Sequence, residues 1–123
     1  MAIQIEAKRI YEPYSKKDGY RILVDRLWPR GISKEKARVD LWFKEITPST
    51  GLRKWYNHEE EKFEEFRMRY QHELDENKGL LESFFKKLKN NKITLLFAGK
   101  ESPINHVVIL KEYMSNIIKR LKL

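Results

Sequence analysis

The chain has 123 residues, no cysteine, and a formal net charge of +8 from 26 basic and 18 acidic side chains. A chain of this length buries a core without disulfides, and the lack of cysteine excludes thiol catalysis and cysteine-ligated metal sites. We find no signal-peptide pattern and no apolar run near the roughly 20 residues of a membrane helix, so we predict one cytoplasmic domain, residues 1–123.

The N-terminal part of the chain predicts two strands and one helix. Residues 2–11 alternate apolar and polar side chains, the pattern of a half-buried strand. Residues 12–20 form a turn-rich polar connector. A second strand is expected over residues 20–28, whose continuous apolar centre is typical of a strand buried on both faces. Ser33 is placed to cap a helix over residues 34–43.

The C-terminal part predicts three helices and one strand. Residues 59–77 repeat aromatic and aliphatic side chains at spacings of three and four, which indicates an amphipathic helix. Gly79 is expected to break this helix before a second one over residues 80–88. Residues 93–98 are apolar throughout and predict a buried strand. Ser102 then suits the N-cap of the last helix.

Apolar strands separated by amphipathic helices indicate an α/β fold with a small, mostly parallel sheet flanked by helices. Only about ten residues join the first two strands, which is short for a parallel crossover, so their relative direction stays open. In open α/β sheets, ligands bind beyond the carboxyl ends of the strands. Two loops leave predicted strands there, residues 25–31 and 99–102, and they converge if their strands are neighbours.

Cationic side chains in these loops predict an anion site. Arg26 and Arg30 offer planar donors for a phosphate or a carboxylate, and Lys100 adds positive charge. Asn105 and His106 lie near the start of the last helix, where backbone amides attract anions. We therefore predict that Arg26, Arg30, Lys100 and Asn105 bind a small anionic ligand.

Asp25 and His106 are the candidate catalytic pair. A helix N-terminus holds a histidine neutral near pH 7, which suits general acid–base chemistry, and Asp25 is the acid that we pair with it. A structural interpretation of the same loop stays open. In that interpretation Asp25 forms a salt bridge with a neighbouring arginine that stabilises the turn, and Trp28 fills the core.

No metal or cofactor is predicted. The histidines, His58, His72 and His106, lack the spacing of metal ligands. The segment GKES resembles part of a nucleotide-binding Walker A loop, but Thr94 occupies the position of its first glycine. Glu101 also follows the lysine, where that loop requires serine or threonine. The sequence therefore predicts no nucleoside triphosphatase.

Charge is uneven along the chain, because residues 1–58 hold 13 basic and 7 acidic side chains and the remainder 13 and 11. Such a surface attracts phosphorylated ligands or nucleic acid. Residues 53–56 (RKWY) interleave aromatic rings with cations, as in base-stacking sites, or they form a buried tryptophan with basic neighbours that reach solvent. We hypothesise a small enzyme or ligand-binding domain. Alternatives are a nucleic-acid-binding or regulatory module, and an interaction module using an exposed Trp42-Phe43 patch.

Four motifs in order, RILVDRLWPRGISKEKA, KEITPSTGLRKW, FRMRYQHEL and TLLFAGKESPINHVVILKEYM, resemble the YeaO-like family of small bacterial proteins, a domain of unknown function (DUF488). The resemblance runs from about Lys8 to Tyr113. It implies a compact α/β domain with a Rossmann-like parallel sheet and no established activity. Some members are labelled transcriptional regulators of the MarR type, but the sequence shows no helix-turn-helix.

The resemblance also bears on the candidate site. The wider superfamily carries a Cys-His-Arg segment after the strand that residues 93–98 resemble, and this chain has Asn105-His106-Val107 there. Thiol chemistry is therefore not implied for this protein. The Asp-Arg pair after the second strand is shared, so the resemblance nominates Asp25, Arg26 and His106.

Overall fold

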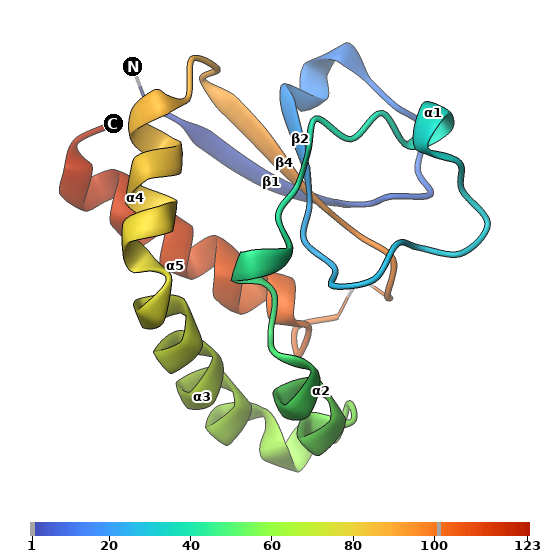
Figure 1. Cartoon of the computed structure of the whole chain (residues 1–123), viewed down its shortest axis with the longest axis vertical. Helices are drawn as coiled ribbons and strands as arrows, with labels where there is room; N and C mark the ends of the chain where they lie inside the picture. The colour runs from blue at the N-terminus through green and yellow to red at the C-terminus, as the bar shows by residue number, and fades with distance from the viewer. Residues whose placement is uncertain (1, 101) are drawn as a thin grey trace.

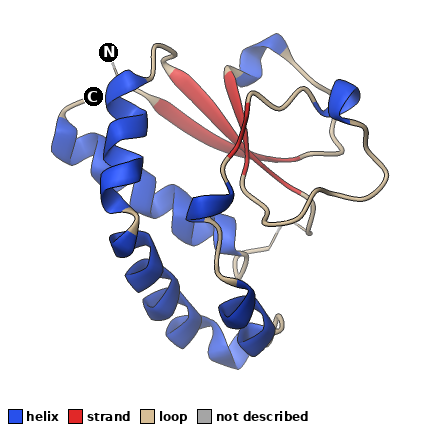
Figure 2. Ribbon diagram, in the orientation of Figure 1, coloured by secondary structure: helices blue, strands red, loops and turns tan. Residues whose placement is uncertain are grey.

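Four parallel strands form the central sheet, in the order β1-β4-β2-β3 (Figures 1 and 2). They are Gln4–Arg9 (β1), Tyr20–Leu23 (β2), Leu41–Trp42 (β3) and Lys92–Phe97 (β4). The computed structural model describes residues 2–100 and 102–123. The prediction of an α/β domain with a small, mostly parallel sheet is confirmed, since every strand pair is parallel.

The two faces of the sheet are covered differently. Helices pack on one face, and they are Thr50–Tyr56 (α2), Phe63–Glu76 (α3), Lys78–Lys87 (α4) and His106–Leu121 (α5). The other face is covered by loops and by the short helix Lys34–Ala37 (α1), on the right in Figure 1. Leu95 packs with the long helices and Leu96 with the loops. Successive strand side chains point to opposite faces and both faces are covered, which explains why β4 is apolar at all positions but Lys92 and Thr94.

The connector between β1 and β2 runs across the face that carries α1. Thr94 of β4 donates its hydroxyl hydrogen to the Asp18 carbonyl at 2.7 Å, which fastens the 3-10 helix Lys16–Asp18 (η1) to the sheet. Gly19 has φ +68, and a Cβ there would lie 2.3 Å from the Lys92 carbonyl oxygen. The first two strands are parallel but not neighbours, because β4 lies between them.

The predictions for residues 20–43 are wrong in part. β2 ends at Leu23, and the helix capped by Ser33 ends at Ala37, where Arg38 adopts a left-handed conformation with φ 48. The following residues pair with β2 as β3 instead of continuing the helix. The helix stops because the Arg21 side chain donates to the carbonyls of Ala37 and Arg38, contacts that a local pattern does not reveal.

Two predicted helix boundaries also differ. Gly79 lies inside α4, and the break falls at Asn77, whose side chain donates to the Glu45 carbonyl at 3.0 Å. The cap of α5 is Asn105, whose side-chain oxygen accepts from the Val107 amide at 2.6 Å. Ser102 instead closes a short turn before it. None of the described helices combines the length and apolarity needed to cross a membrane.

Candidate functional site

Asp25 and His106 come together at the carboxyl ends of the neighbouring strands β2 and β4. The His106 Nε2 atom lies 3.7 Å from an Asp25 carboxylate oxygen and 2.8 Å from the Val24 carbonyl oxygen. The other Asp25 carboxylate oxygen accepts a hydrogen bond from the Ala98 amide at 2.8 Å. The loop after β2 is therefore joined both to the loop after β4 and to the first residue of α5.

Arg9 holds the β4 loop from its other side. Its guanidinium donates to the Gly99 carbonyl and to the Ala98 carbonyl, each at 2.8 Å. Asp25 takes the amide of Ala98 and Arg9 takes its carbonyl, so the backbone at this residue is held between β1 and β2. The sequence analysis did not identify Arg9. Its position as the last residue of β1, at the same edge of the sheet, was the available signal.

Burial opposes charge on both members of the pair. Burial raises the pKa of the Asp25 carboxyl above its ordinary value, and His106, the Ala98 amide and Arg53 offset only part of this. Burial lowers the pKa of His106, while the hydrogen bond to Val24 and the Asp25 charge act in the opposite direction. His106 is therefore neutral at pH 7, and Nε2 carries the hydrogen that it donates to the Val24 carbonyl.

Arg26 serves the site by positioning a neighbouring segment. Its guanidinium donates to the Pro48 carbonyl at 3.1 Å and to the Thr47 carbonyl at 3.0 Å. These carbonyls precede Ser49, which caps α2 and accepts from the Leu52 amide. Arg26 thus ties the loop after β2 to the start of α2.

Arg53, on α2, is a functional candidate that the sequence analysis placed in a different site. Its charge contributes to the pKa of both Asp25 and His106, so its guanidinium lies near the pair. The side chain is exposed, and among residues 2–100 and 102–123 it has no hydrogen-bond or ion-pair partner. Arg53 is far along the chain from both Asp25 and His106, so only the packing of α2 in the folded protein brings it near them.

The remaining predicted ligand-binding residues are not all at this pair. Arg30 is exposed, and its backbone carbonyl accepts from the Tyr11 hydroxyl at 2.7 Å, on the side of the sheet that α1 covers. Lys100 is exposed in the β4 loop, and its carbonyl accepts from the Asn105 side-chain amide at 3.3 Å. Asn105 therefore both caps α5 and braces the β4 loop.

The aromatic residues of the RKWY segment are largely interior. Tyr56 is buried and donates its hydroxyl hydrogen to the Ile104 carbonyl at 2.8 Å. Trp55 is half-buried, with the Arg69 guanidinium 4.3 Å and the Lys62 ammonium 5.2 Å from its ring centroid. Neither ring is presented to solvent as a base-stacking platform would be.

The expectation of an exposed Trp42-Phe43 patch is wrong. Phe43 is 5% exposed and belongs to the main core. Trp42 is half-buried, donates its indole N–H to the Asp25 carbonyl at 2.7 Å and packs edge-to-face on Trp28, with ring centroids 5.5 Å apart. Trp28 itself is half-buried in the smaller core and donates to the Ile32 carbonyl. Trp42 of β3 therefore packs in the second face of the sheet against Trp28 of the loop after β2.

Two open grooves lie beside the pair rather than over it. One, of about 480 Å³, runs between α2 and α3, and the other, of about 450 Å³, is lined by Arg26, Tyr70 and Glu73 among others. Asp25 and His106 line neither of them. The described parts of the chain contain no group of three or more His, Cys, Asp or Glu side chains placed to hold a metal ion.

Residues 4–122 match a protein family described as the inactive DUF488-N3 subclade. The chain is similar to the uncharacterized protein YeaO of Escherichia coli strain K12, with 41% identity over 94% of this chain and 100% of YeaO. It is also similar to the uncharacterized protein Rv3073c of Mycobacterium tuberculosis strain H37Rv, with 38% identity over 91% of this chain and 94% of that protein. No solved structure matches it. The protein is a member of the YeaO-like DUF488 family, a family of unknown function.

Proposed function

We propose that this protein is a non-catalytic ligand-binding domain that holds a small anion, a phosphate or a carboxylate, at the carboxyl edge of its sheet. The anion would lie against the Asp25–His106 pair, with Arg53 as the principal cation and Lys100 as a second one. The observation that carries the proposal is the solvent-facing Arg53 guanidinium, which lacks a partner among the described residues and influences both members of the pair.

The charges around the pair favour an anion over a cation. Arg53 and Lys100 are exposed, and the 16-residue helix α5 begins at His106, so its positive dipole end adds to their charge. Burial opposes the negative charge of Asp25, the acid of the pair, and raises its pKa.

Binding without catalysis agrees with the groups that are present. The Nε2 hydrogen of His106 is already bonded to the Val24 carbonyl, so this N–H is not free to donate to a ligand. The position that resembles a cysteine in the wider superfamily is Asn105, an amide that caps α5 and offers no nucleophile. The family description, an inactive subclade, points the same way.

The test is titration of the protein with inorganic phosphate and with acetate, following the imidazole resonances of His106 by NMR at low ionic strength. Arg53→Gln should weaken binding about tenfold, the loss of roughly 1.4 kcal/mol that one charge-assisted contact provides. Lys54→Gln is the matched control, since it removes the same charge from the next exposed residue of α2. An Arg53→Gln protein that binds both anions like wild type would overturn the proposal, as would the absence of saturable binding.

A further inference from the structure

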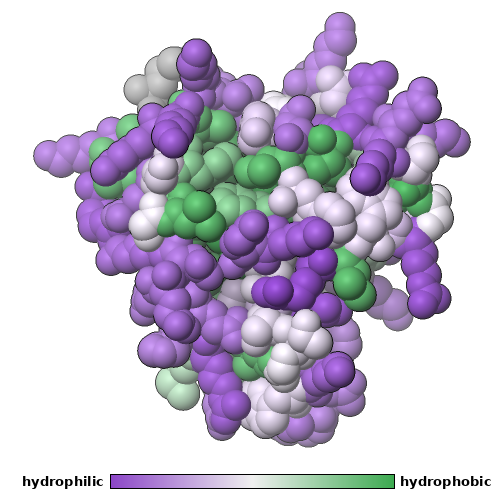
Figure 3. Space-filling model, in the orientation of Figure 1, coloured by the Kyte–Doolittle hydropathy of each residue, from purple (hydrophilic) through white to green (hydrophobic). Residues whose placement is uncertain are grey.

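Exposed cations collect on the segments that cover the second face of the sheet. Figure 3 shows hydrophilic side chains projecting from the end of the molecule where η1 and α1 lie. We call the following seven side chains, all exposed, the basic cover: Lys16, Lys17, Arg30, Lys34, Lys36, Arg38 and Lys44. In the part of the chain that the structure describes, none of them forms an ion pair.

On the helical layer, several surface cations form ion pairs with acidic side chains. There Arg67 pairs with Glu112 at 3.0 Å and Lys62 with Glu59 at 2.8 Å, and Arg120 pairs with Glu82. Some cations of the helical layer are thus paired, whereas all seven side chains of the basic cover are unpaired among the described residues. Crowded like charges destabilise a folded protein, so an uncompensated cluster indicates an anionic partner.

Glu35 on α1 and Glu45 beside Lys44 are exposed and form no ion pair among the described residues, whereas three other acidic side chains near the basic cover are engaged in the structure itself. Asp18 is buried and binds Lys8 and Arg21, and Asp40 accepts from the Arg21 amide at 2.8 Å. Glu12 accepts from the Arg9 amide at 3.0 Å. These carboxylates hold the backbone, and their bonds limit how far they can turn to neutralise the surface cations.

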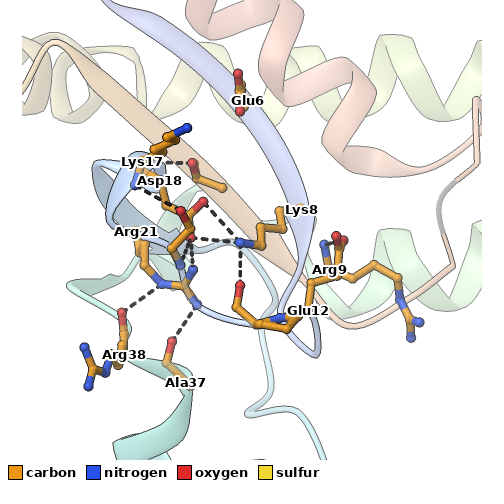
Figure 4. Close-up of polar contacts among 12 residues, drawn as sticks. Glu6, Lys8, Arg9, Glu12, Lys17, Asp18, Arg21, Ala37 and Arg38 are labelled. Atoms are coloured by element: carbon orange, nitrogen blue, oxygen red, sulfur yellow. Dashed lines mark hydrogen bonds and ion pairs between the residues drawn. The ribbon is translucent and has the colours of Figure 1, made fainter.

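Buried polar contacts lie beneath the basic cover, as Figure 4 shows. Arg21 is 1% exposed, pairs with Asp18 of η1, and donates to the Ala37 carbonyl at 2.8 Å and the Arg38 carbonyl at 3.1 Å. The same guanidinium therefore joins η1 to the end of α1. A surface whose backbone is already ordered loses less conformational entropy when a partner binds.

Two aromatic rings lie among these cations. Tyr11 is 43% exposed and Tyr14 is 40% exposed. The Tyr14 ring centroid is 4.5 Å from the Arg38 guanidinium, and Tyr11 bonds the Arg30 backbone. Cations that contact phosphates, interleaved with exposed rings on which bases stack, form the surface that single-stranded nucleic acids recognise.

We propose that the basic cover binds single-stranded nucleic acid, with its cations on the phosphate backbone and Tyr11 and Tyr14 available for base stacking. This surface is separate from the anion site proposed above, because it is built by η1, α1 and their loops on the other face of the sheet. The exposed rings favour a nucleic acid over an acidic protein, whose carboxylates would contact the cations alone.

The first experiment measures fluorescence anisotropy of a labelled oligouridylate about 20 nucleotides long at about 50 mM salt, a condition in which phosphate contacts are strong. The variant combines Lys16→Gln, Lys17→Gln, Lys34→Gln and Lys36→Gln. The matched control combines Lys86→Gln, Lys87→Gln, Lys111→Gln and Lys119→Gln, which removes the same charge from exposed positions on α4 and α5.

The basic-cover variant should lose at least about 30-fold in affinity. The negative slope of log K against log salt should become shallower by about 3, near 0.7 for each lost phosphate contact. The control should change affinity by less than about threefold. Equal losses in both variants would show attraction to net charge only and would overturn the proposal. So would a wild-type protein that does not bind the oligonucleotide. Thermal melts of all three proteins establish that each is folded.

The second experiment tests the rings and the class of partner. Tyr11→Leu should weaken binding of the oligouridylate several-fold, the effect of losing one base–ring stack, and leave binding of a duplex DNA unchanged. Tyr11→Phe keeps the ring and should bind like wild type. If Tyr11→Leu also binds like wild type, or if polyglutamate or anionic vesicles bind as tightly and with the same sensitivity to the lysine changes, the assignment to single-stranded nucleic acid is overturned.

Discussion

His106 approaches the Asp25 carboxylate to 3.7 Å while donating its Nε2 hydrogen to the carbonyl of the adjacent Val24, at 2.8 Å. The two side chains are therefore held near each other through backbone bonds, with Asp25 anchored on the Ala98 amide. Burial opposes the charged form of each one, raising the pKa of Asp25 and lowering that of His106. This geometry determines how stability should respond to mutation and to pH.

Asp25→Asn should raise the free energy of unfolding at pH 7. Burial raises the pKa of Asp25, so its contribution to stability is greatest below the ordinary value of 3.8 and declines as pH rises through the folded value. Asparagine keeps an oxygen for the Ala98 amide without the charge. Asp25→Ala removes that oxygen and should cost about 1–3 kcal/mol. Urea unfolding at pH 7 measures both, and equal destabilisation by the two variants would contradict the prediction.

His106→Gln should remove a pH dependence of stability. Burial lowers the pKa of His106, so below the ordinary value of 6.5 the unfolded chain binds a proton that the folded protein does not. The stability of the wild-type protein therefore decreases as the pH is lowered. Glutamine offers an N–H to the Val24 carbonyl and does not titrate. The measurement compares unfolding free energies at pH 7.5 and 5.5. His72→Gln, on the surface of α3, should keep the wild-type slope; a slope unchanged in His106→Gln would refute the assignment.

Arg21→Met should destabilise the fold by about 3–5 kcal/mol, because it removes one of the two cations that pair with the buried Asp18 and leaves the Ala37 and Arg38 carbonyls without their donor. Asp18→Asn combined with Arg21→Met should recover part of the loss, which a double-mutant cycle measures. A single variant with near wild-type stability would show that the pair is not needed.

The same cluster predicts sensitivity to acid. Burial alone would raise the pKa of Asp18, but Lys8, the Ser15 amide and Arg21 outweigh it and lower that pKa below 3.8. The stability from this carboxylate is therefore present above the unfolded value and is lost as pH falls through the folded one. Urea unfolding between pH 5 and 2.5 should show a smaller decline for Asp18→Asn than for wild type. Parallel curves for the two proteins would be the contrary result.

Asn105→Cys should create a reactive thiol. A cysteine at the N-cap of the 16-residue α5 lies at the positive end of the helix dipole, where the Val107 amide that Asn105 now binds stabilises a thiolate. Its pKa should fall below about 7.5, against about 8.5 for an ordinary thiol. The pH dependence of alkylation by iodoacetamide measures this cleanly, since the chain has no other cysteine. Ser115→Cys, exposed in mid-helix, is the control, and equal pKa values for the two thiols would contradict the prediction.

The sequence by itself determined the α/β class of the fold and the prediction that Asp25 and His106 lie at the same edge of the sheet. Continuous apolar runs over residues 22–24 and 93–97 require strands covered on both faces, and such strands belong to a parallel α/β sheet. Because ligands bind where parallel strands end, Asp25 and His106 were nominated before their loops were seen to meet. Local pattern sufficed for the strands themselves, since burial is encoded in each segment separately, whereas the relative direction of the first two strands stayed open until the sheet was seen.

Only the tertiary structure decided which segments became neighbours. Strand order placed β4 between β1 and β2, which brought Arg9 to the loop after β4, and helix packing carried Arg53 to the pair and left Arg30 on the other face. α1 ended at Ala37 because the buried Arg21 side chain of β2 donates hydrogen bonds to the carbonyls at the end of this helix. Such hydrogen bonds join residues far apart in the chain, so no local periodicity records them, and they form only when the whole sheet is assembled.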